Sequence, residues 1–128
     1  EWAVVLVGFG NLGSALFHYK GFARQGFRIA VVVDDDPTKV GREIDRVPIV
    51  ASRDVAREVK TRGIQIAVVA VPPESAQAVT DQLVAAGIRA VLNFAPTRLK
   101  VPRDVRLKNV DLSIELETLS FYLAKSSR

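Results

Sequence analysis

The sequence has no cysteine and no methionine, and His18 is its only histidine. Without cysteine, disulfide bonds, thiolate nucleophiles and cysteine-ligated zinc sites are excluded. A Ser-His-Asp triad would have to use His18, and no Gly-x-Ser-x-Gly nucleophile elbow occurs. A P-loop motif and a metal-ligand spacing of His, Asp and Glu are also absent from the sequence. We therefore expect a binding protein rather than an enzyme.

Long apolar runs are missing as well. No run reaches the ~18–20 residues that a membrane-spanning helix needs, and Gly8 and Gly10 interrupt the only early apolar run, so no signal peptide is predicted. A chain of 128 residues with 48% apolar and 25% charged residues is typical of one globular domain. We expect it to be cytoplasmic, without membrane contact. Because it begins at Glu1 directly before a strand-like run, we also expect it to be part of a longer protein.

The net charge is +4, and the basic residues are scattered except in one stretch. That stretch contains Arg98, Lys100, Arg103, Arg106 and Lys108. Such a run is usually a solvated face, and an anionic partner is the alternative.

Short, β-branched apolar runs alternate with amphipathic segments along the chain. Continuous apolar runs such as residues 3–7 and 66–71 are typical of strands buried on both faces of a parallel sheet. The alternation predicts an α/β fold with a doubly wound, mostly parallel Rossmann-type sheet and helices on both faces. The expected strands are residues 3–7, 28–33, 47–50, 66–71, 89–94 and 105–110, and the expected helices are 11–24, 52–62, 74–86 and 112–123.

Three local signals refine this prediction. The first helix has one apolar stripe, and His18 lies off it, so we expect His18 on the surface. Pro48 suits only an edge strand, and Ser52 is expected to cap the helix that follows it. The stripe consists of Leu12, Ala15, Leu16 and Tyr19.

A glycine-rich turn, Gly-x-Gly-x-x-Gly, joins the first strand to the first helix. Gly8 permits the tight turn, Gly10 allows the backbone to approach a pyrophosphate, and Gly13 allows close helix–strand packing. The amides at the helix start, around Asn11 and Leu12, then stabilise the phosphates together with the helix dipole. A plain strand-to-helix turn is the alternative, but three glycines at this spacing would then reduce helix stability without benefit.

An acidic residue ends the second predicted strand. Asp34 follows Gly13 by 21 positions, close to the ~20 expected for the carboxylate that binds the adenosine ribose. A carboxylate there would repel a 2′-phosphate, so the sequence predicts NAD(H) rather than NADP(H). Alternatively, Asp34 merely begins a turn before Pro37, as Asp35 and Asp36 can do equally well.

Ligands of open α/β sheets lie across the carboxyl ends of the strands. Val71 and Pro72 end the fourth predicted strand, and Asn93 and Phe94 end the fifth. Prolines at these ends would form a stiff apolar wall, and Asn93 could hydrogen-bond a carboxamide. The alternative is that all of them are ordinary strand terminators. Pro73 and Pro96 belong to the same two ends.

The last predicted helix is apolar on two sides and therefore needs two surfaces to pack against. One would be its own domain, and the other a partner subunit related by a two-fold axis. Alternatively, residues 111–114 are extended and the opposed faces never form. Leu112, Leu116, Leu119 and Leu123 form one face, and Ile114 and Phe121 lie nearly opposite.

The chain resembles the C-terminal NAD(H)-binding domain of the Rex redox-sensing transcriptional repressors over nearly its whole length. The most specific segments are Asn93-Phe94-Ala95-Pro96 and Asn109-Val110-Asp111, the latter leading into the final helix. Further matching segments are residues 7–16 with Tyr19 and Gly21-Phe22, then Asp34, Asp36-Pro37, Lys39-Val40-Gly41, Val71-Pro72, 85–88 and Leu119-Ser120-Phe121.

The resemblance implies a homodimer that binds NADH and NAD+ and leaves operator DNA when NADH binds. It divides the chain into an NAD(H)-binding domain, residues 1–110, and a dimerisation helix with its tail, 111–128, which is swapped between subunits. An N-terminal winged helix, outside this sequence, would contact the DNA. Lys39, Tyr19 and Asp111 join the expected cofactor-binding residues. Leu112 stands where some members have a Phe that reaches the partner's nicotinamide pocket, which weakens the expectation for that pocket.

Two other functions stay open at this point. The chain could be the cofactor domain of an NAD-dependent dehydrogenase, or a CoA-binding domain like that of acyl-CoA ligases, which has the same architecture. Relative affinities for NADH, NADPH and CoA would separate these possibilities.

Overall fold

The computed structural model describes residues 1–126, without the side chains of residues 112–115, 117 and 126. Its centre is a seven-stranded sheet in the order β3-β4-β2-β1-β5-β6-β7. All neighbouring strands are parallel except β3 and β4. The strands are β1 (Trp2–Val7), β2 (Phe27–Val33), β3 (Glu43–Ile44), β4 (Val47–Val50), β5 (Ile66–Val69), β6 (Ala90–Asn93) and β7 (Arg106–Asn109). The predicted doubly wound sheet is confirmed, and the order reverses between β1 and β5.

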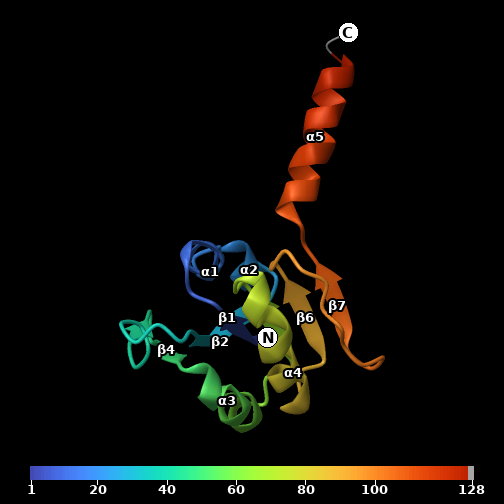
Figure 1. Cartoon of the computed structure of the whole chain (residues 1–128). Coiled ribbons are helices and arrows are strands. Elements are labelled where there is room, and N and C mark those ends of the chain that lie inside the picture. The colour runs from blue at the N-terminus through green and yellow to red at the C-terminus, as the bar shows by residue number, and fades with distance from the viewer. Residues whose placement is uncertain (127–128) are drawn as a thin grey trace.

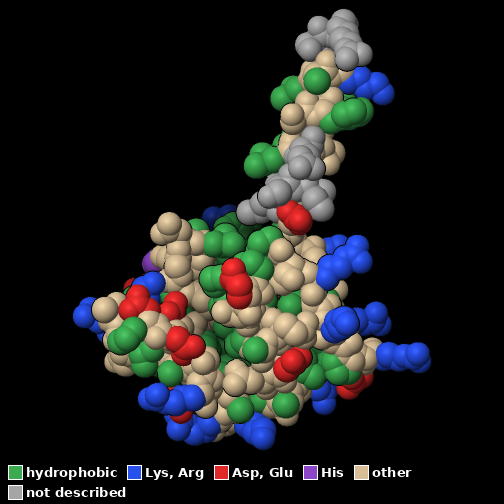
Figure 2. Space-filling view, in the orientation of Figure 1, with side chains coloured by type: hydrophobic (Ala, Val, Ile, Leu, Met, Phe, Trp, Pro, Cys, Tyr) green, Lys and Arg blue, Asp and Glu red, His purple; other side chains and the backbone are tan. Residues whose placement is uncertain are grey.

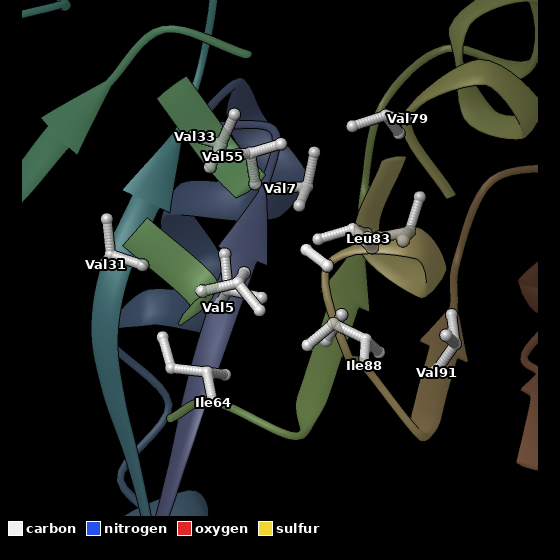
Figure 3. Packing of buried hydrophobic residues seen from close by; sticks show 14 of the residues in the cluster. Val5, Val7, Val31, Val33, Val55, Ile64, Val79, Leu83, Ile88 and Val91 are labelled. Atoms are coloured by element: carbon white, nitrogen blue, oxygen red, sulfur yellow. The ribbon is translucent and has the colours of Figure 1, made fainter. Parts of the chain in front are cut away.

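Helices cover both faces of this sheet (Figure 1). The two faces of β1 show why, because Val5 and Val7 pack with α3 and α4, whereas Val4 and Leu6 face α1. Figure 3 shows the first of these clusters, in which Val55 and Leu83 lie against Val5 and Val7. The helices are α1 (Asn11–Phe17), α2 (Gly21–Arg24), α3 (Val55–Arg62), α4 (Pro73–Ala85) and α5 (Leu112–Ser126), with a 3-10 turn at Ser52–Asp54.

The first predicted helix and its apolar stripe are wrong in part. The chain leaves the helix at His18 and begins the short α2 at Gly21. Of the predicted stripe, Leu16 packs on the sheet together with Phe17, whereas Leu12 and Tyr19 are 36% and 59% exposed. The reason is the close approach of α1 to the glycine turn, where Gly13 packs against the Gly8 carbonyl and so sets the orientation of the helix. His18 is exposed, as expected.

The β3–β4 hairpin escaped prediction. Asp45 and Arg46 form its turn with φ values of 48° and 69°, although neither is glycine or asparagine. Pro48 pairs opposite Glu43, so β4 is not the outermost strand, contrary to the expectation. Ser52 does not cap α3 either, because its hydroxyl donates to Asp35.

Helix α5 extends away from the body of the domain (Figure 1). Its described large apolar side chains are all exposed, from 59% for Leu119 to 71% for Phe121. The expectation that one face packs on its own domain is therefore wrong for these residues. Among residues 1–126, no helix is both long and apolar enough to cross a bilayer.

Candidate functional site: a cleft at the glycine turn

A cleft of about 880 Å³ lies at the carboxyl ends of β1, β2 and β5. This edge collects the turns that follow these parallel strands, and the volume falls within the ~300–1,000 Å³ usual for ligand sites. Nine of the predicted site residues line the cleft: Gly8, Gly10, Asn11, Leu12, Asp34, Lys39, Val71, Pro72 and Phe94.

At two of the three glycines, neighbouring backbone atoms leave no space for a side chain. Gly8 has φ +103°, and a Cβ there would collide with the carbonyl oxygen of Ala70. At Gly13 a Cβ would collide with the carbonyl oxygen of Gly8. The roles assigned to these glycines, a tight turn and close packing, are confirmed.

Gly10 differs, because a Cβ there would meet no protein atom within 4 Å. Its φ of −81° is open to any residue. Gly10 also lines the cleft, and its N–H has no acceptor among the described residues. The space that a side chain would fill is therefore cleft space, as an approaching diphosphate requires.

The peptide groups of Phe9 are held by two charged side chains. Asp34, which is half-buried, accepts the Phe9 N–H at Oδ2 (2.8 Å) and the Asp36 N–H at Oδ1 (2.8 Å). Lys39 Nζ donates to the Phe9 carbonyl oxygen at 2.8 Å. Asp34 and Lys39, which follow β2, thus fix the turn after β1, and both still line the cleft.

The two acids after Asp34 serve the loop. Asp35 accepts the N–H and hydroxyl of Ser52, each at 2.8 Å, and these hydrogen bonds lower the pKa of the Asp35 carboxyl. Asp36 accepts the N–H of Thr38 at 2.9 Å and its hydroxyl at 2.8 Å, which lowers the pKa of Asp36 in the same way. Both also line the cleft, and their turn role agrees with the expectation.

Asn93 lies behind the cleft wall rather than in it. It is 1% exposed, and its Nδ2 lies 3.1 Å from the Ala95 carbonyl oxygen, 3.2 Å from that of Thr97 and 3.0 Å from Asn109 Oδ1. Its Oδ1 accepts the Ala95 N–H at 2.9 Å. With its amide committed to the turn, Asn93 positions Phe94 and Pro96, which do line the cleft. This corrects the expected carboxamide contact.

Three other predicted site residues lie outside the lining formed by the described residues. Gly13 is buried beneath the turn. Tyr19 packs edge-to-face on Phe22, with ring centroids 5.1 Å apart, outside the cleft. Asp111 is half-buried and lies in the short segment of chain that joins β7 to α5.

Sequence reasoning missed one wall of the cleft. Ser75, Ala78 and Gln82 contribute it from α4, and Ser52 adds a hydroxyl from the loop after β4. A signal was present, since α4 begins directly after β5 and its first turn must face the carboxyl edge. Among the residues whose side chains the structure describes, no group of three His, Asp or Glu could hold a metal ion.

The basic stretch between residues 98 and 108 lies away from this cleft. Figure 2 shows Lys and Arg side chains spaced along the side that β7 forms in Figure 1. None of the basic residues between 98 and 108 lines the cleft, and Lys39 is the one cation among its described lining residues. An anionic ligand would therefore meet backbone amides, one lysine, the acids of the β2 end and Glu74 of α4. Such a surface suits a diphosphate joined to an uncharged ribose.

The first 97 residues match the family model described as the CoA binding domain. The chain belongs to the CoA-binding domain family. The chain is 47% identical over 122 residues to the redox-sensing transcriptional repressor Rex of Streptomyces coelicolor, covering 95% of this chain and 47% of that protein. It is 47% identical over 128 residues to Rex of Syntrophomonas wolfei, covering 100% and 61%. The resemblance to the Rex family is confirmed, and the domain spans about half the length of these curated relatives.

Solved structures of a Rex-family repressor are also similar to this chain. A crystal structure of RSP, a Rex-family repressor, superposes on the CoA-binding-family domain with a TM-score of 0.93 and 36% identity, covering 98% of this chain and 60% of that one. RSP in complex with β-NADH gives 0.92 and 36%, covering 98% and 61%. RSP with β-NAD+ and operator DNA gives 0.91 and 36%, covering 98% and 58%.

Proposed function

We propose that the chain is the NADH/NAD+-sensing domain of a redox-responsive transcriptional repressor and that it is not an enzyme. The observation that carries the proposal is the glycine turn, in which the open side of Gly10 and the carboxylate of Asp34 face one cleft. Relatives named as repressors, and RSP complexes with NADH and with NAD+ plus operator DNA, support it.

In the proposed binding mode, the diphosphate lies over Gly10 and receives hydrogen bonds from the amides that begin α1. The adenosine ribose lies beside Asp34, whose two carboxylate oxygens each retain acceptor capacity beyond the one backbone N–H that each accepts. Val71, Pro72 and Phe94 form an apolar wall for a ring.

Sensing requires only that NADH and NAD+ bind two arrangements of the protein with different affinities. The two forms differ by a hydride and by the charge of the nicotinamide ring. We propose, from the Rex resemblance, that Asp111 and Tyr19 respond to this difference. Because neither lines the cleft of one described chain, a second copy would complete the nicotinamide end.

We propose a homodimer formed through α5, with residues 1–110 as the cofactor domain and residues 111–128 as the dimerisation segment. Leu116, Leu119 and Phe121 are exposed on α5. The body offers a matching apolar groove of about 210 Å³ on the sheet face beside α2. Burying both surfaces would stabilise the dimer. Val4, Leu6, Phe22, Phe27, Ile29, Ile66, Val68 and Leu92 line the groove.

We also propose that a winged helix in the remainder of the full-length protein contacts operator DNA, in the cytoplasm.

Coenzyme A is the second candidate ligand, because the matching family is named for it. CoA also contains an adenosine diphosphate and could use the same glycine turn. Its ribose, however, carries a 3′-phosphate, which the carboxylate of Asp34 would repel. This repulsion favours NAD(H).

Calorimetric titration of the chain with NADH, NAD+, NADPH and CoA tests the proposal. We expect NADH to bind more tightly than NADPH and CoA. Tighter binding of CoA than of NADH, or no binding of NADH, would overturn the sensor assignment.

A further inference from the structure

The peptide groups of Phe9 are clamped by charges of opposite sign. The N–H donates to Asp34 Oδ2 and the carbonyl oxygen accepts from Lys39 Nζ, each at 2.8 Å. Phe9 is 9% exposed, and its ring packs edge-to-face on Phe17, with centroids 5.8 Å apart. The side chain and both polar backbone groups of this residue are therefore fixed at once.

Lys39 is itself held in place by the loop after β2. Its Nζ lies 3.9 Å from Asp36 Oδ2, and its backbone N–H donates to the Asp36 carbonyl oxygen at 2.9 Å. The side chain is 35% exposed and lines the cleft. A contact across 30 residues of sequence thus joins this loop to the glycine turn.

The Phe9 carbonyl and the Gly10 N–H belong to one planar trans peptide and point in opposite directions. A lysine that holds the carbonyl therefore also sets the direction of the Gly10 N–H. Glycine at position 10 would otherwise let this peptide rotate, because no Cβ restricts it. A rotated peptide would present its carbonyl oxygen, with partial negative charge, to the diphosphate.

Building on the proposed function, we infer that Lys39 is a positioning residue for diphosphate binding. It orients the Phe9–Gly10 peptide so that the N–H, not the carbonyl, serves the ligand. Affinity for ligands that contain a diphosphate then depends on Lys39, and affinity for adenosine alone does not.

The experiment compares Lys39→Met, Lys39→Gln and Lys39→Arg in the 128-residue chain, with Lys60→Met, an exposed lysine on α3, as the matched control. NADH, ADP-ribose and adenosine are titrated into each. Losing a charge-assisted hydrogen bond should weaken NADH and ADP-ribose binding about tenfold in Lys39→Met. Adenosine binding should be unchanged, Lys39→Arg should restore most of the affinity, and Lys39→Gln part of it.

A second readout needs no ligand. In ¹H–¹⁵N spectra of the free chain, the Gly10 amide resonance should shift in Lys39→Met and return toward its wild-type position in Lys39→Arg. If Lys39→Met fails to fold, the comparison of Lys39→Gln with Lys39→Arg tests the same inference.

Unchanged NADH affinity in a folded Lys39→Met would overturn the inference and leave the proposed function intact. Equal losses for adenosine and ADP-ribose would also overturn it, since Lys39 would then contact the nucleoside directly. A wild-type chain that binds neither NADH nor ADP-ribose would instead overturn the proposed function itself.

Discussion

Gly10 and Gly13 lie in one turn, yet a methyl group at each should have a different effect. Gly10→Ala meets no protein atom, so the melting temperature should hardly change. The methyl would fill the diphosphate path with a misfit of about 1–3 kcal/mol, weakening NADH binding about tenfold or more. Gly13→Ala is the matched variant, and it should lower the melting temperature because its Cβ collides with the Gly8 carbonyl. Calorimetry and thermal melts separate the two effects, and full NADH affinity in Gly10→Ala would place the diphosphate elsewhere.

Asp34 fixes the Phe9 N–H, and in the proposed binding mode it also lies beside the ribose. Asp34→Ala should weaken NADH binding and reduce discrimination against NADPH, because the repulsion of a 2′-phosphate disappears. Titrations with both cofactors measure the ratio, with Asp104→Ala, an exposed acid before β7, as the control. An NADH/NADPH ratio equal to wild type would remove Asp34 from the ribose site.

At the scale of elements, the loop after β2 is attached to the start of the 3-10 turn before α3 through Asp35. Its hydrogen bonds to Ser52 lower the pKa of Asp35 from the ordinary value of 3.8. A carboxyl with a depressed folded-state pKa stabilises the fold above its unfolded-state pKa, and this stabilisation is lost as pH falls through the folded-state pKa. The free energy of unfolding of the wild type, measured in urea, should therefore fall as the pH drops below about 4.

The variant Asp35→Asn isolates this contribution. It should be less stable than wild type at pH 7, and its decline in acid should be shallower. Asp104→Asn serves as the control. Parallel pH profiles for wild type and Asp35→Asn would show that the Ser52 contact does not contribute through ionisation.

Among the elements, some could be predicted from the sequence and others could not. Residues 3–7 are an unbroken apolar run, and parallel strands with helices on both faces need such runs, so β1 could be predicted without tertiary information. The β3–β4 hairpin could not, because Asp45 and Arg46 adopt positive φ without the glycine or asparagine that usually announces it. The stripe on α1 was wrong in part, with Leu16 packed but Leu12 and Tyr19 exposed, because a backbone contact at Gly13 sets the orientation of that helix.

At the scale of the whole molecule, α5 presents apolar side chains that the described body of the domain does not cover (Figure 1). Phe121 is 71% exposed, and a buried glutamate in its place would oppose association. Phe121→Glu should convert a dimer to a monomer in light scattering. Lys125→Glu, a charge change at an exposed position of the same helix, should leave the mass unchanged. A dimeric mass for Phe121→Glu would contradict the proposed role of α5.

The parts of the candidate site that depend on short stretches of sequence could be predicted. Strand ends meet at one edge of a parallel sheet, so the turn at Gly8 and the acid at Asp34 could be assigned to one cleft from spacing alone. Asn93 could not be placed, because whether a polar side chain at a strand end faces the ligand or the next turn depends on its neighbours. Here Asn109, 16 residues later, helps to hold the amide away from the cleft.

The residue order by itself determined the alternation of strands and helices, the glycine turn and the acid that follows it, since periodicity and spacing are properties of neighbours along the chain. Only the tertiary structure decided that Lys39 reaches the Phe9 carbonyl, that Asn93 faces inward and that α5 leaves the body. Each of these depends on groups brought together across long stretches of sequence, where packing, charge and hydrogen-bond geometry select one partner among many.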